Sequence, residues 1–198
     1  WIIGLLVLIG SITPGLAFMS IYSHEDTRVT ASKWIYQNIP NNSYVLSETA
    51  NVVDIPLGLS NNETMKQWSN AKVISFDFYH MDENKTLFND LLDHLEKANY
   101  IFIPSRRIFA NYPQLPKKFP LVTKYYQLLI SGALGFEKAT EINSFPSITF
   151  PLYPKPYTLT FPDERSEETY TVFDHPVIRI YRKVKPFTVE QYRSLFEN

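Results

Sequence analysis

Two consecutive arginines, Arg106 and Arg107, follow the apolar run Tyr100–Ile103 closely along the chain. Such a run is typical of a buried strand, and open α/β sheets bind ligands at the carboxyl ends of their strands. A pair of guanidinium groups at that position can hold a lipid phosphate through charge-assisted hydrogen bonds. The alternative is that both side chains are solvated in a loop. The pair is therefore a candidate substrate-binding site.

A carboxylate and an imidazole are adjacent at Asp174 and His175, a combination that can act as an acid and base pair. Adjacent side chains in a tight turn point apart, however, and an Asp shortly before Pro176 is ordinary turn chemistry. The pattern favours a structural turn, with acid and base chemistry as the alternative.

Tyr125 and Tyr126 form a third candidate pair. On a helix, adjacent side chains point about 100° apart. We therefore expect one ring to pack in the core and the other to reach a neighbour or the membrane surface. Core packing is the favoured interpretation.

Other chemistries find little support. The histidines have no metal-ligand spacing, and His80 lies near Asp82 and Glu83 in a polar connection that reads as a hydrated loop. No nucleophile elbow, phosphate-binding loop or dinucleotide fingerprint is present, and the absence of cysteine excludes disulfides and thiolate metal sites. The sequence thus indicates no catalytic group, metal or cofactor in this chain.

The overall charge is close to neutral. The formal net charge is -1, the pI is about 6.5, and charged residues make up 20% of the chain. A nucleic-acid-binding domain normally has a basic excess, so we expect no nucleic-acid partner.

The elements that would position these residues begin with an uncharged, apolar segment over residues 1–22. As a helix it would be about 33 Å long, enough for the roughly 30 Å hydrocarbon core of a bilayer. A signal peptide would instead begin with Met and a basic region, so we expect the last span of a longer protein. Pro14 is expected to kink or interrupt this helix. No basic cluster follows it, which favours an extracytoplasmic domain over residues 23–198.

The rest of the chain has the alternation of an α/β domain. Leu87, Leu91, Leu92 and Leu95 form one face of a helix, and a buried strand follows at once, which favours a mostly parallel sheet. The expected elements, in chain order, are a helix over 26–38, strands over 44–46 and 72–76, a helix over 85–98, a strand over 100–103 and a helix over 120–130 that ends before Gly132.

Residues 145–162 are rich in proline and aromatic residues, which excludes a central strand or a long helix. We expect an extended surface loop. Its aromatic rings either pack against the domain and hold the loop in place, or the loop lies along the membrane or over a site. After it, residues 170–173 and 177–182 are expected to form a β-hairpin that closes the sheet, and a last helix is expected to end near Phe196.

Four stretches carry a resemblance to a known family: "YTVFDHPVIRIYRK" (170–183), "YIFIPSRR" (100–107), "PLVTKYYQLLISGALGF" (120–136) and "TRVTASKWIYQNIP" (27–40). They resemble the C-terminal region of prokaryotic polytopic membrane glycosyltransferases of the PMT-like class, which is the dolichyl- or polyprenyl-phosphate-mannose-protein mannosyltransferase-like group of the GT-C enzymes. None of the four is a catalytic signature.

The resemblance implies an enzyme that transfers a sugar from a polyprenyl-phosphate-linked donor at the outer membrane face. Its catalytic base would be a carboxylate in an early outer loop, upstream of Trp1, and its partners would be the bilayer, the donor and the upstream transmembrane helices. The inserted domain of the better-known protein mannosyltransferases is missing, so the acceptor stays open. Two alternatives are a non-enzymatic anchored domain that binds a glycan, peptide or partner protein, and a self-contained hydrolase, which the missing nucleophile motif disfavours.

Overall fold

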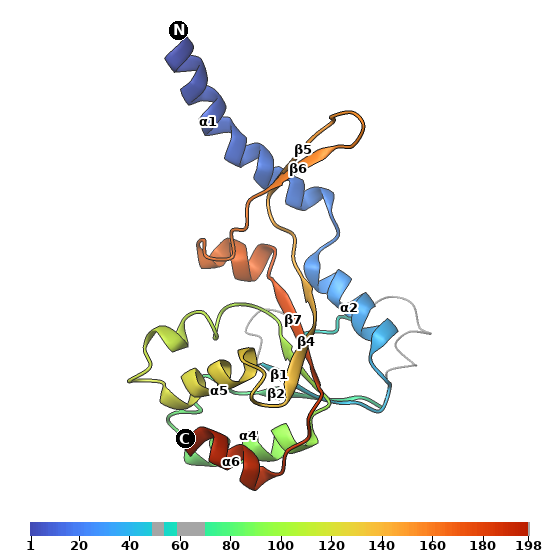
Figure 1. Cartoon of the computed structure of the whole chain (residues 1–198), viewed down its shortest axis with the longest axis vertical. Coiled ribbons are helices and arrows are strands. Elements are labelled where there is room, and N and C mark those ends of the chain that lie inside the picture. Colours follow the sequence, from blue (N-terminus) through green and yellow to red (C-terminus); the bar gives the residue numbers. More distant parts are fainter. Residues whose placement is uncertain (49–53, 59–69, 198) are drawn as a thin grey trace.

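The computed structural model describes residues 1–48, 54–58 and 70–197 (Figure 1). The apolar opening forms the helix α1 (Ile2–Met19), which passes into a short 3-10 helix, η1 (Ser20–Ser23). Among the described residues, the helical segment that begins with α1 is the one long and apolar enough to cross a membrane. α1 runs through Pro14 without a break, so the interruption allowed for by the sequence does not occur.

The domain is built on a five-stranded sheet in the order β2-β1-β3-β7-β4. Its strands are β1 (Tyr44–Glu48), β2 (Lys72–Phe76), β3 (Tyr100–Ile103), β4 (Phe136–Ile142) and β7 (Ile178–Lys183). The first three are mutually parallel, whereas β7 is antiparallel to both β3 and β4. The expected α/β class with a mostly parallel central sheet is therefore confirmed.

Helices cover both faces of this sheet. They are α2 (Thr27–Asn38), α4 (Lys85–Lys97), α5 (Pro120–Ile130) and α6 (Val189–Glu197), with a 3-10 turn, η2, at Tyr112–Gln114. Ile101 and Ile103 of β3 point to the cluster formed with α4, α5 and α6, while Tyr100 and Phe102 point to the cluster formed with α2. Alternate side chains of a strand lie on opposite faces, so β3 is apolar throughout because both faces are buried.

Two helices, α2 and α4, begin with a side-chain cap, and glycines follow the end of α5. Asp26 caps α2 by accepting from the backbone N–H of Arg28 at 2.7 Å, and Asn84 caps α4 in the same way. Gly132 and Gly135, which follow α5, both have a positive φ. A Cβ on Gly135 would lie 2.2 Å from the carbonyl oxygen of Lys185, so no other residue fits there.

The expected β-hairpin at the C-terminus is wrong. Residues 169–174 form a π-helical turn, η3 (Thr169–Asp174), and β7 pairs with β3 and with β4, a strand that the sequence did not suggest. The side chain of Glu167, just before the turn, accepts from the backbone N–H of Thr169 at 2.9 Å, and the N–H of His175 donates to the carbonyl of Tyr170 at 3.1 Å. These local bonds oppose the β propensity of the segment but do not act alone, because Arg28 also donates to backbone carbonyls in the turn.

The expected loop over 145–162 is also corrected, because it contains a two-stranded antiparallel hairpin. Its strands β5 (Ser147–Phe150) and β6 (Tyr157–Thr160) lie between the prolines, none of which falls within a strand. The hairpin leaves the domain beside the end of α1, opposite α4 and α6 (Figure 1).

Candidate functional site

The carboxyl end of β3 lies on the side of the domain that meets α1. Ile103, the last residue of β3, pairs with Arg179 near the start of β7. Just before β7, the ring of His175 meets the ring of Phe18 in α1 edge to face, with 5.7 Å between the centroids. The edge at which α/β sheets usually bind ligands is therefore the edge nearest the apolar helix.

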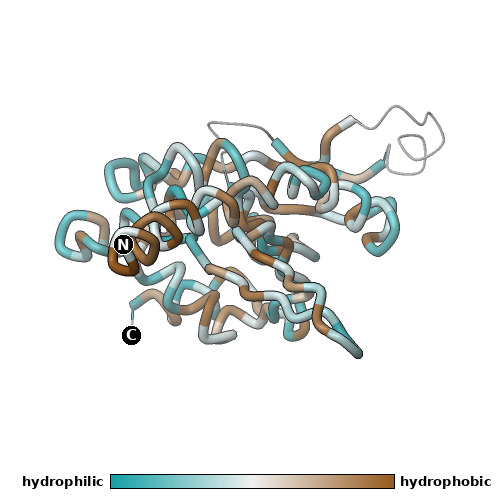
Figure 2. Tube along the Cα trace, turned by 90° about the horizontal axis from the view of Figure 1, so that it is seen from above, coloured by the Kyte–Doolittle hydropathy of each residue, from teal (hydrophilic) through white to brown (hydrophobic). Residues whose placement is uncertain are grey.

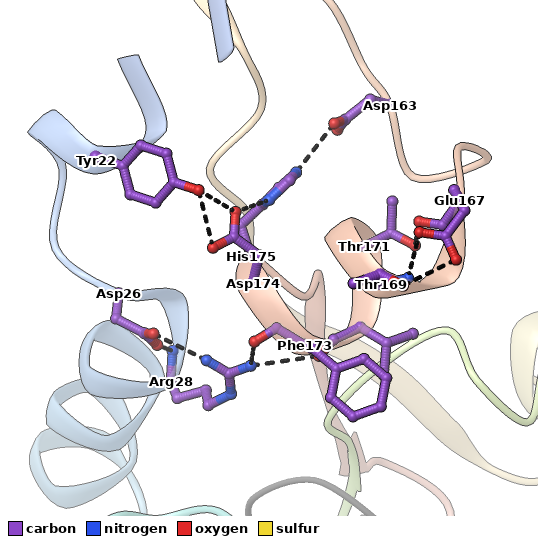
Figure 3. Close-up of polar contacts among 11 residues, drawn as sticks. Tyr22, Asp26, Arg28, Asp163, Glu167, Thr169, Thr171, Phe173, Asp174 and His175 are labelled. Atoms are coloured by element: carbon purple, nitrogen blue, oxygen red, sulfur yellow. Dashed lines mark hydrogen bonds and ion pairs between the residues drawn. The ribbon is translucent and has the colours of Figure 1, made fainter. Parts of the chain in front are cut away.

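Four side chains meet at this end and form what we call the helix-end cluster: Tyr22, Asp163, Asp174 and His175 (Figure 3). The Nδ1 of His175 lies 3.0 Å from the carboxylate of Asp174, and its Nε2 lies 3.0 Å from the carboxylate of Asp163. The hydroxyl of Tyr22, in η1, donates to Asp174 at 3.3 Å. The expectation that Asp174 and His175 point apart is wrong, because they end a helical turn instead of occupying a tight turn.

The cluster holds its imidazole at both nitrogens. His175 is only 3% exposed, and a neutral imidazole can donate to one carboxylate but not to two. Keeping both hydrogen bonds thus requires an imidazolium or a protonated carboxyl group. A cavity of about 170 Å³ adjoins it and is lined partly by Glu25, Asp26 and Ser144. The arrangement joins η3 to the preceding loop.

Arg28, which the sequence did not single out, ties the same turn to α2. Its guanidinium is largely buried, pairs with Asp26 at 2.8 Å, and donates to the backbone carbonyls of Val172 and Phe173 (Figure 3). The partners in η3 are more than 140 residues away along the chain, so no local pattern indicates them.

The two arginines of the candidate phosphate site lie against the same turn. Arg106 donates to the carbonyl of Ser166 at 3.1 Å and to the hydroxyl of Thr171 at 3.3 Å. Arg107 pairs with Glu168 at 2.9 Å, and its side chain remains 32% exposed. Both guanidinium groups thus have protein partners, and a phosphate bound here would share or replace them.

Tyr125 and Tyr126 lie elsewhere, in the core beneath the sheet. Both are fully buried and pack edge to face, with ring centroids 5.0 Å apart. The favoured interpretation, core packing, is therefore confirmed for both rings, and neither ring reaches the surface of the domain. Two rings from loops pack against them, Phe78 on Tyr125 and Phe109 on Tyr126.

A buried carboxyl group at the carboxyl end of β1 was missed by the sequence reasoning. Glu48 is 2% exposed, and its Oε1 accepts a hydrogen bond from Tyr126 at 2.7 Å. Burial raises the pKa of Glu48 to about 8, although this bond and the positive charge of Arg179 oppose the shift. The available signal was an acidic residue two positions after the apolar run 44–46.

No metal site is evident in the part of the chain that the structure describes, where no three His, Cys, Asp or Glu side chains are grouped to hold an ion. His80 pairs with Asp77 at 2.6 Å, and His94 meets the hydroxyl of Tyr44 at 2.7 Å. These two histidines therefore serve local hydrogen bonds.

Comparisons with protein-family models, with curated proteins and with solved structures found no significant match. The resemblance to PMT-like enzymes therefore stays a prediction. Four of the six candidate site residues gather around η3 at the end nearest α1, whereas Tyr125 and Tyr126 do not.

Proposed function

We propose that this chain is the membrane-anchored C-terminal part of an integral membrane glycosyltransferase that transfers a sugar from a polyprenyl-phosphate donor at the outer membrane face. The observation that carries the proposal is the direction of the sheet, whose ligand-binding edge is the edge nearest α1. A ligand bound there lies where the chain leaves the bilayer, which is the depth at which a lipid-linked donor presents its phosphate.

The residues at this edge suit a supporting role. Arg106 and Arg107 offer positive charge to a phosphate, while Glu48 is a carboxyl group that burial keeps protonated near neutral pH. The catalytic base belongs to the upstream part of the enzyme, and this domain assists the access of donor or acceptor.

A non-enzymatic anchored domain that binds a glycan, peptide or partner protein is the second candidate. It is favoured by the internal partners of both arginines, since a side chain that already fixes η3 is less available to a substrate.

The test compares transfer from a polyprenyl-phosphate sugar by the full-length protein in liposomes, with and without Arg106→Ala and Arg107→Ala. Loss of two charge-assisted hydrogen bonds to phosphate should raise the KM for the donor about tenfold or more. The matched control is Arg182→Ala, whose exposed ion pair with Glu137 lies at the opposite end of the sheet.

An unchanged donor KM in the double variant would remove the arginines from the proposal. A full-length protein that transfers no sugar but binds a glycan or peptide through this domain would favour the second candidate.

A further inference from the structure

The β5–β6 hairpin has one polar and one apolar face. Register pairs Ser147 with Thr160 and Thr149 with Thr158, and the hydroxyls of the second pair lie 3.0 Å apart. Since alternate residues of a strand lie on opposite faces, the other face carries the remaining pairs. These are Ile148 with Leu159 and Phe150 with Tyr157.

The domain leaves the apolar face largely uncovered. Phe150 is 43% exposed, Tyr157 is 56% exposed, and in the connecting turn Leu152 and Tyr153 are 59% and 99% exposed. A two-stranded hairpin that stands alone in water is marginally stable at best, so this one needs a further surface to rest on.

The charge of the segment indicates what kind of surface that is. Residues 144–162 contain no acidic residue and a single basic one, Lys155, although charged residues make up 20% of the chain. The free-energy cost of moving such a segment out of water is small, because only one charged group has to keep its hydration. A lysine near its tip can extend its ammonium group to lipid headgroups while its stem stays in an apolar layer.

A hydrogen bond at the base of the hairpin fixes the position of the hairpin at the end of α1. The backbone N–H of Ser147 donates to the hydroxyl of Ser20 at 2.9 Å, and Ser20 directly follows the last residue of α1. From there the hairpin extends away from the domain along a different line from α1, and both carry apolar residues (Figure 2). The apolar face of the hairpin thus begins beside the end of α1, at the point where a spanning helix would leave the bilayer.

We propose that the β5–β6 hairpin lies in the lipid interface of the same membrane that α1 crosses. Phe150, Leu152 and Tyr153 enter the boundary between headgroups and acyl chains, where aromatic side chains concentrate, and Lys155 faces anionic headgroups. The hairpin is then a second membrane contact that fixes the tilt of the domain over the bilayer. The proposal depends on α1 crossing the membrane and not on the glycosyltransferase activity.

The test uses the absence of cysteine, which makes any introduced thiol unique. Tyr153→Cys and Phe150→Cys variants of the chain are labelled with an environment-sensitive fluorophore and reconstituted into vesicles of zwitterionic and anionic phospholipid. Both labels should shift to shorter emission wavelengths and be quenched by lipids that carry a spin label near the headgroup.

Two controls accompany them. Thr149→Cys places the label on the polar face and should be quenched less than Phe150→Cys, while Val184→Cys lies beyond the far end of β7 and should stay aqueous and unquenched. Tyr153 is 99% exposed, so its replacement should leave thermal unfolding unchanged.

Two results would overturn the proposal. One is a label at residue 153 that is as water-exposed as the label at residue 184. The other, measured in the full-length protein as well as in this chain, is a label shielded from both water and lipid quencher, because it would show that protein covers the hairpin.

Discussion

At the scale of single residues, the clearest consequence is the pH dependence that Glu48 imposes on stability. Its pKa rises from the ordinary value of 4.5 to about 8 in the folded protein. Between these values the folded state keeps a proton that the unfolded state releases, so the free energy of unfolding falls as the pH rises and levels off above pH 8.

Replacing Glu48 by Gln should remove this slope. The amide oxygen can still accept from Tyr126, and the gain in stability at pH 8 should be on the order of a few kcal/mol. Thermal unfolding in detergent micelles between pH 4.5 and 9 provides the measurement, with Glu137→Gln as the control because that exposed carboxylate lies on the sheet edge. Equal slopes in wild type and Glu48→Gln would contradict the assignment.

At the scale of elements, η3 depends on Arg28. Arg28→Ala leaves the carbonyls of Val172 and Phe173 without their donor, which should cost about 2–3 kcal/mol and lower the Tm by about 5–10 °C. Amide hydrogen exchange over residues 169–175 should accelerate. Lys33→Ala on the same helix is the control, because its ion pair with Glu25 is exposed and should contribute less than about 1 kcal/mol. Equal losses in the two variants would contradict the role of Arg28.

The elements that the sequence predicts are those with local determinants. Helix α4 follows from its apolar face and the cap at Asn84, and β3 follows from four consecutive apolar residues buried on both sides. The π-helical turn depends instead on Arg28, far away in the chain, and β4 is a mostly polar edge strand that only its pairing with β7 defines. Such elements lack a periodic signal because distant contacts determine them.

At the scale of the whole molecule, the same reasoning explains why the candidate site was predicted only in part. Arg106 and Arg107 were placed at the strand end from the adjacent apolar run. The helix-end cluster could not be predicted, because Tyr22 meets Asp174 only when η1 packs against η3, and Asp163 meets His175 only when the loop before η3 folds back onto it. The position of this cluster depends on how α1 meets the domain. That arrangement can be tested by measuring whether two residues on opposite sides of the junction are close together.

Ser20 and Ser147 are a suitable pair for this test, because their hydroxyl oxygens lie 3.2 Å apart. In a chain without cysteine, Ser20→Cys with Ser147→Cys should form a disulfide on mild oxidation in vesicles and leave no free thiol for labelling, because two side chains this close need little movement to bond. Ser11→Cys with Ser147→Cys is the control. Nine residues of helix separate Ser11 from Ser20, a rise of about 13 Å, so this pair should stay reduced. Free thiols in the first variant, or a disulfide in the second, would contradict the junction that places α1 next to the carboxyl end of β3.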